Sequence, residues 1–176
     1  PYDFTQRSTY NQWVNREPRF YVGITYNNSL WLNTTSVGNI ITETWYNGNS
    51  GRAAGGNDYP PTGYIVRKNM ITGARSNQNR TIPMLRLAEI YLDYAEALNE
   101  VDPGNPDILI YLNEIRERAG IPGYGEGGIA VPGTQDAMRE AIHKERRVEL
   151  AFESVRYFDV RRWKNGELYF DGPAHG

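Results

Sequence analysis

Carboxylates and arginines are concentrated in the C-terminal third of this 176-residue sequence. After Thr134, apolar side chains recur every three or four residues, which is the spacing of one helix face. One member of this stripe is an acid, Glu145, which stands between Ala141 and Val148. A buried carboxylate is costly unless cations and hydrogen bonds compensate its charge. We therefore predict a structural network of internal ion pairs that includes Glu145, Glu149, Arg156 and Arg162.

A catalytic role is the alternative for two of these acids. Glu145 and Glu149 could be the carboxylate pair of a glycoside hydrolase. They lie at positions i and i+4, so they are neighbours on a single helix. The two acids that flank a glycosidic bond normally project from separate elements into an open cleft. We therefore favour the structural interpretation and predict neither a catalytic residue nor an enzymatic activity.

A second candidate site lies in the polar N-terminal part of the sequence. Residues 33–63 are rich in Gly, Asn, Ser and Thr, and so long an irregular segment is uncommon in a compact domain unless it has a function. Aromatic rings in such a setting suit a sugar, which stacks its apolar face on a ring while polar side chains bond its hydroxyls. The candidates in and beside this segment are Trp31, Trp45, Tyr46 and Asn47. The alternative is that these rings pack the loops onto helices.

The remaining composition excludes several kinds of chemistry. The chain has no cysteine, which excludes disulfides and thiolate metal sites, and its net charge of −2 gives no electrostatic basis for binding nucleic acid. No cofactor motif is present, so no cofactor is predicted. His143 is expected at a solvated helix position. We expect Glu89, Asp93 and Glu96 to form salt bridges with the arginine-rich helix rather than a calcium site. No apolar run is long enough to span a bilayer.

Helices must position the acids and arginines, and the spacing predicts them at 83–100, 106–119, 135–153 and 155–164. Pro83 suits the first position of the first helix, Asn105 can cap the second ahead of Pro106, and Thr134 can cap the third. The short turn after residue 101 makes the first two helices an antiparallel hairpin, the building block of tetratricopeptide-like repeats. The apolar face of the first helix consists of Met84, Leu87, Tyr91, Tyr94 and Leu98. The stripe of the second helix consists of Ile108, Leu112, Ile115 and Ala119, and that of the third of Met138, Ala141, Glu145, Val148 and Phe152.

The first eighty residues are a different kind of sequence. Alternation from Phe20 to Tyr26 predicts a strand, which Asn27 and Asn28 can turn, and residues 64–68 predict a second short strand. The chain is therefore expected to be mainly α, with a loop-rich segment at 1–80 that contains a short β-hairpin and a helical region at 81–176. The two would form one domain overall.

Several of these segments resemble the SusD/RagB family. The run LRLAEIYLDYAEAL at 85–98 is similar to a hallmark of that family, as are ERRVELAFE at 145–153 and RYFDVRRW at 156–163. The segment LNEIRERAG at 112–120 also fits, and 16–21 and 62–68 match weaker family segments. The resemblance covers about residues 13 to 164. One departure is Ser154, where the family pattern has glycine, so the tight turn there is expected to be looser.

The resemblance implies a function that composition does not. SusD-like proteins are non-enzymatic, surface-exposed lipoproteins of the outer membrane in Bacteroidetes. They bind glycans, or peptides in the RagB-like case, and deliver them to a SusC-like transporter that depends on TonB. Members are about three times longer than this chain, so we expect a C-terminal fragment that lacks the N-terminal lipid anchor and is itself soluble. The family also implies that the ligand site is shared with the N-terminal half.

Overall fold

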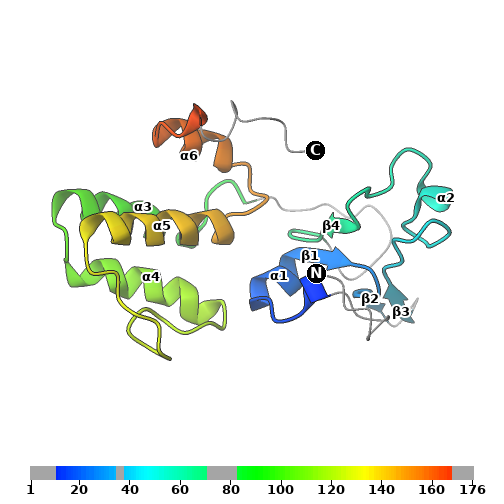
Figure 1. Cartoon of the computed structure of the whole chain (residues 1–176), viewed down its shortest axis with the longest axis horizontal. Coiled ribbons are helices and arrows are strands. Elements are labelled where there is room, and N and C mark those ends of the chain that lie inside the picture. Colours follow the sequence, from blue (N-terminus) through cyan, green and yellow to red (C-terminus); the bar gives the residue numbers. More distant parts are fainter. Residues whose placement is uncertain (1–10, 35–37, 71–82, 168–176) are drawn as a thin grey trace. The chain divides into compact units, whose positions relative to one another are not determined.

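The computed structural model describes residues 11–34, 38–70 and 83–167. It divides into two compact units, Pro1–Pro83 and Met84–Gly176, and Figure 1 labels their helices and strands. Helices dominate the structure and the strands are short, so the chain is mainly α as predicted. None of the helices in the described ranges combines the length and the apolar character that crossing a membrane requires.

The first unit is built from short elements: η1 (Asn11–Trp13), α1 (Pro18–Gly23), β1 (Ile24–Tyr26), β2 (Leu30–Thr34), β3 (Gly38–Ile41), α2 (Arg52–Gly55) and β4 (Tyr64–Val66). Strands β1 and β4 pair antiparallel, with Thr25 opposite Ile65. Strands β2 and β3 form an antiparallel hairpin with an irregularity between Leu30 and Leu32. The predicted second strand near residues 64–68 is therefore present, and the hairpin lies at 30–41.

The strand predicted from Phe20 to Tyr26 is wrong in its first part. Residues Pro18–Gly23 form α1, with Pro18 in the first turn where its missing N–H costs nothing, and the strand begins at Ile24. In a strand, Phe20 and Tyr21 would point to opposite faces. In the helix, both rings contact Tyr26, at centroid separations of 5.8 and 6.3 Å. Tertiary packing of aromatic rings thus outweighs the period-two pattern.

The second unit consists of α3 (Leu87–Val101), α4 (Pro106–Arg118), α5 (Gln135–Glu149) and α6 (Arg156–Arg162). The side chain of Asn105 accepts a hydrogen bond from the Asp107 N–H, and that of Thr134 accepts one from the Ala137 N–H, so both predicted caps are confirmed. Helices α3 and α4 form the predicted hairpin, and α5 packs against α3 (Figure 1). This is the arrangement expected of tetratricopeptide-like pairs.

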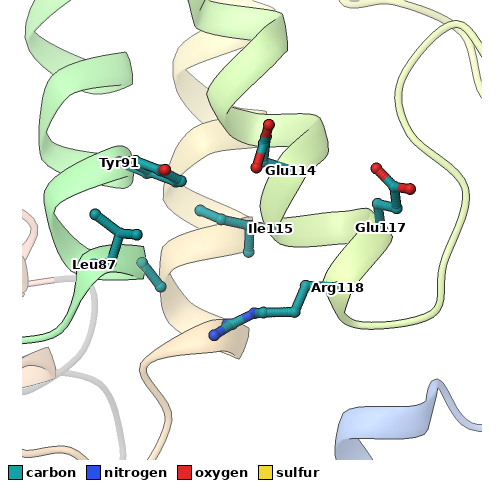
Figure 2. Close-up of a pocket in the computed structure, with 7 residues that line it drawn as sticks. Leu87, Tyr91, Glu114, Ile115, Glu117 and Arg118 are labelled. Atoms are coloured by element: carbon teal, nitrogen blue, oxygen red, sulfur yellow. The ribbon is translucent and has the colours of Figure 1, made fainter.

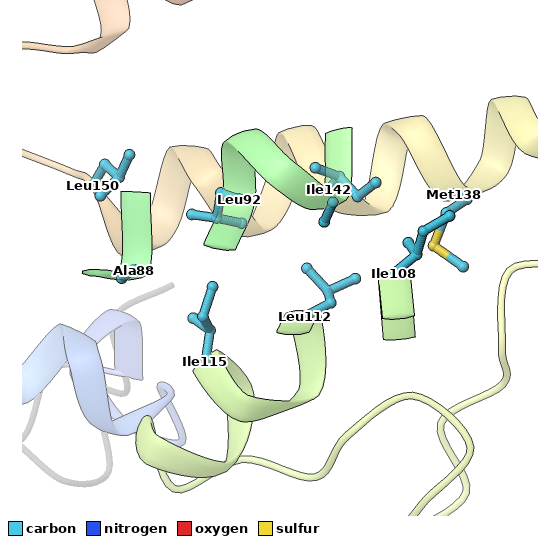
Figure 3. Close-up of a cluster of buried hydrophobic side chains, with 9 residues drawn as sticks. Ala88, Leu92, Ile108, Leu112, Ile115, Met138, Ile142 and Leu150 are labelled. Carbon is cyan, nitrogen blue, oxygen red and sulfur yellow. The ribbon is translucent and has the colours of Figure 1, made fainter. Parts of the chain in front are cut away.

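One apolar core joins α3, α4 and α5. Figure 3 shows Ala88 and Leu92 of α3, Ile115 of α4 and Ile142 of α5 turned toward a common centre. The complete buried set is Ala88, Leu92, Ala95, Ile108, Leu112, Ile115, Met138, Ile142 and Leu150. Of the stripe predicted for α4, Ile108, Leu112 and Ile115 face the core, whereas Ala119 is only partly buried. In the first half of α5, Met138 and Ala141 are buried as predicted.

The apolar face predicted for α3 is wrong in part: Tyr91 and Leu98 are partly buried and pack against the core, but the other three residues do not. Met84 is 99 % exposed, and Leu87 and Tyr94 are exposed as well. The core takes Ala88, Leu92, Ala95 and Asn99, a stripe displaced by one residue and therefore rotated by about 100°. Both stripes have three-four spacing, and the predicted one has the larger side chains. The small alanines of the true face let α3 approach its neighbours closely.

Two predicted helix boundaries also differ from the structure. Helix α3 begins at Leu87 and not at Pro83, since Arg86 is still extended (φ −137°, ψ 157°). Helix α5 ends at Glu149, and Phe152, which was expected on its buried stripe, is exposed. Phe152 and Ser154 both have positive φ, at 65° and 64°, and this conformation cannot continue a right-handed helix.

Candidate functional site

Two acids of α5, Glu145 and Glu149, are buried against arginines from outside this helix. Glu145 is 3 % exposed, and its Oε2 lies 3.0 Å from Nη1 of Arg116 on α4. The Glu149 carboxylate accepts from Arg86, whose Nη1 is 2.7 Å from Oε1, and also from Arg118. Because Glu145 and Glu149 are enclosed and neutralised, they do not have the open geometry of a hydrolytic pair.

Among the arginines that form these ion pairs, Arg146 is the most deeply buried. Its Nε donates to both carboxylate oxygens of Asp159 at 2.8 Å, and its Nη1 donates to Asp93 at 2.6 Å. Nη2 lies 3.7 Å from Glu89, as predicted for the acids of α3. The sequence reasoning did not identify Asp159 as a partner. The sequence feature that could have indicated Asp159 is its position in the RYFDVRRW segment, three residues after Arg156.

Glu96 connects α3 to α5 and α6. Its carboxylate accepts from the Arg162 guanidinium and from the Trp163 indole N–H, the latter at 2.8 Å. Nε2 of His143 is 3.5 Å away. Burial raises the pKa of Glu96, but hydrogen bonds from His143, Arg162 and Trp163 outweigh it and hold the pKa well below its usual range. Arg162 thus pairs with Glu96 and Asp159 rather than with Glu145 or Glu149.

The prediction for His143 is wrong. Its ring is half-buried and stacks on Trp163 with a centroid separation of 3.6 Å and an interplanar angle of 17°. Arg156 lies on the same indole, with its Cζ 5.5 Å from the ring centroid. The sequence spacing of α5 did not reveal this position, because its partner Trp163 follows α6. Across the described ranges, no cluster of three or more acidic or histidine side chains could hold a metal ion.

The candidate aromatic residues lie on the connection between β3 and α2. Trp45 is 47 % exposed, Tyr46 is 67 % exposed, and Asn47 is exposed, whereas Trp31 in β2 is half-buried. A buried ring could not stack on a sugar. Because Trp45 and Tyr46 are exposed, both remain candidates for binding one. Whether they bind a ligand stays a prediction.

Backbone and side-chain bonds hold this connection in one shape. The Ser50 N–H donates to the Glu43 carbonyl at 2.9 Å, and the Asn49 amide donates to the Ile41 carbonyl at 2.7 Å. A Cβ on Gly51 would lie 1.7 Å from the Trp45 carbonyl oxygen, so only glycine fits there. The two exposed rings are therefore presented from a constrained segment.

A groove lies between α3 and α4 in the helical unit. Its volume is about 500 Å³, and Figure 2 shows Leu87 and Tyr91 of α3 facing Ile115 of α4 across it. Glu114 and Arg118 line the α4 side. The groove combines an apolar floor with charges of both signs.

These features place the chain among mainly α proteins built from tetratricopeptide-like helix hairpins. A family model described as "SusD family" matches residues 1–176. The chain belongs to the SusD family.

Curated relatives and solved structures agree with this assignment. SusD-like proteins P2 and P25 of Formosa agariphila are 41 % identical over 104 residues and 34 % identical over 107 residues, which is 56 % and 60 % of this chain. A SusD-like protein (BF3747) from Bacteroides fragilis matches with a TM-score of 0.70 and 32 % identity over 88 % of this chain. The protein BT4246 matches with a TM-score of 0.75 and 28 % identity over 95 %. The matches span 20 % of each curated relative and 29 % of each solved chain.

Proposed function

We propose that this chain is part of a non-enzymatic outer-membrane lipoprotein that captures glycans at the cell surface and passes them to a SusC-like TonB-dependent transporter. The observation that carries the proposal is the SusD family match across residues 1–176. Membership in this family supports a nutrient-binding role, and SusD-like proteins are generally binding proteins without catalytic activity. The choice of glycan as the nutrient goes beyond the family match.

The geometry supports binding over catalysis. The two acids considered as a hydrolytic pair are enclosed by arginines, Glu145 by Arg116 and Glu149 by Arg86. A general acid or nucleophile needs access to the substrate. The loop that carries Trp45 and Tyr46 offers exposed rings on a constrained backbone instead. Stacking on such rings binds a sugar without changing it.

The direct test uses the full-length protein and its transporter. Affinity electrophoresis against a panel of plant, algal and host glycans should retard the protein in at least one gel, and the SusC-like transporter should copurify with it from detergent-solubilised outer membranes. Incubation with the retarding glycan should release no new reducing ends. Binding of peptides with no retention by any glycan would favour the RagB-like alternative, and release of reducing ends would favour the hydrolase.

A further inference from the structure

A second cavity lies in the helical unit, between α5, the start of the segment after α6, and the loop that precedes α5. Its volume is about 560 Å³, which is in the range of small-molecule sites. Two aromatic residues line it, Tyr124 from the loop and Trp163 from the end of α6, together with the amide of Asn165. We call this space the α5–α6 cavity.

Both aromatic residues of the α5–α6 cavity are fixed by contacts outside it. The Tyr124 backbone is bonded in both directions to Asn113, whose Oδ1 accepts from the Tyr124 N–H at 2.8 Å and whose amide donates to the Tyr124 carbonyl at 3.1 Å. Trp163 is held by its stack on His143 and by its bond to Glu96. The Trp163 ring and the Tyr124 backbone are therefore already in place when a ligand arrives, which lowers the entropic cost of binding.

The charge of the α5–α6 cavity is mostly positive. Its lining includes Lys144, Arg147 and Arg156 but a single acid, Glu140. Glu140 lies one helical turn before Lys144, so it can offset one of the three charges. Within the described ranges, no ion pair is formed by Lys144 or Arg147. These two side chains are exposed and can turn toward an anion in the cavity.

The excess of positive charge in the α5–α6 cavity does not extend to a neighbouring cavity. It has a volume of about 320 Å³ and shares His143 and Trp163 as a common wall. Its two arginines are already neutralised, Arg139 by Glu100 at 2.6 Å and Arg162 by Glu96. On one side of the His143–Trp163 stack both arginines are paired. On the other side, Lys144 and Arg147 form no ion pair with the residues that the structure describes.

We infer that the α5–α6 cavity binds an acidic saccharide, with the carboxylate or sulfate group of the sugar between Lys144 and Arg147. Arginine donates two parallel hydrogen bonds to such a group, and lysine adds a point charge. The rings of Tyr124 and Trp163 and the amide of Asn165 supply contacts for the rest of the sugar. The saccharide part of this inference rests on the proposed function, whereas the anion-binding part does not.

Calorimetric titration of the full-length protein at low salt tests the inference, with sodium glucuronate, sodium sulfate and glucose as probes. Glucuronate should bind and glucose should not bind at this cavity. The double variant Lys144→Gln/Arg147→Gln should bind glucuronate roughly tenfold more weakly, since it loses two charge-assisted contacts. The control is Arg161→Gln, which removes one positive charge from an exposed α6 position outside the cavity and should leave the affinity unchanged.

The outcomes separate the parts of the inference. Absence of binding by both glucuronate and sulfate at millimolar concentrations, or equal affinities of the wild type and the double variant, would overturn it. Sulfate binding without glucuronate binding would overturn the saccharide assignment. A protein that binds glucuronate at this cavity but is retarded in no glycan gel would contradict the proposed function and leave the anion-binding part of the inference intact. Thermal melting of the double variant should match that of wild type, because both substituted side chains are exposed.

Discussion

Glu145 and Arg146 are neighbours in the sequence, and both are buried, yet they pair with different helices. Glu145 contacts Arg116 of α4, whereas Arg146 contacts Asp93 of α3 and Asp159 of α6. Helix α5 thereby connects to every other helix of its unit through charged groups. Because such pairs are costly to desolvate, they add little net stability. Their main effect is that any other packing of the helices, which would leave a buried charge without its partner, has a higher free energy.

Removal of one partner makes this effect measurable. Glu145→Ala leaves the half-buried Arg116 without its carboxylate, and we expect the free energy of unfolding to fall by about 3–5 kcal/mol. Urea denaturation followed by circular dichroism is the measurement. Glu114→Ala removes an exposed acid from α4 and serves as the control, with an expected change within about 0.5 kcal/mol. If Glu145→Ala unfolded at the wild-type urea concentration, the network would not stabilise the fold.

Glu96 predicts a specific dependence of stability on pH. Because its pKa is lower in the folded protein than in the unfolded chain, its contribution to stability is complete above the unfolded value of about 4.3. The contribution is lost as the pH falls from there through the lower folded pKa. Glu96→Gln should therefore cost stability at pH 7 and progressively less below pH 4. Urea midpoints of both proteins between pH 7 and pH 3 test this, and a difference that stays constant with pH would contradict it.

At the level of elements, the turn between α5 and α6 departs from the family pattern. Ser154 stands where the resemblance implies glycine, and its φ is 64°. A left-handed conformation costs a residue with a Cβ about 1–2 kcal/mol. Replacement by glycine removes this cost, but the greater freedom of glycine in the unfolded chain offsets part of the stabilisation. Ser154→Gly should therefore stabilise the protein by about 0.5–1 kcal/mol in urea denaturation. Ala151→Gly, at a position without positive φ, should instead destabilise it by about the same amount.

The elements also show what could be predicted from the sequence. The caps at Asn105 and Thr134 and the stripe of Ile108, Leu112 and Ile115 depend on local chemistry and spacing, and all were predicted. The buried face of α3 was not predicted correctly, because two apolar stripes that are one residue apart both have the three-four spacing of a helix face. Only contacts with other helices choose between them. For the same reason the stack of His143 on Trp163 could not be predicted, since it joins positions twenty residues apart.

On the scale of the whole molecule, two kinds of candidate site belong to different units. The Trp45 and Tyr46 loop lies in the first unit, and the α5–α6 cavity lies in the second. The sequence indicated the loop through its composition, since polar residues around aromatic rings form a recognisable pattern. The cavity gave no such signal, because its lining comes from a loop, α5 and the end of α6, and only the fold brings these together.

Replacement of the exposed rings tests the first of these sites in the full-length protein. If a sugar stacks on the constrained loop, Trp45→Ala and Tyr46→Ala should each weaken glycan binding by about 1–3 kcal/mol, the value of burying one large apolar group. Tyr157→Ala is the matched control, because it removes an exposed ring from α6 and should leave the glycan affinity unchanged. Calorimetric titration with the captured glycan provides the affinities. Equal affinities for wild type and both loop variants would show that recognition does not use this loop. A comparable loss in Tyr157→Ala would show that the effect is not specific to it.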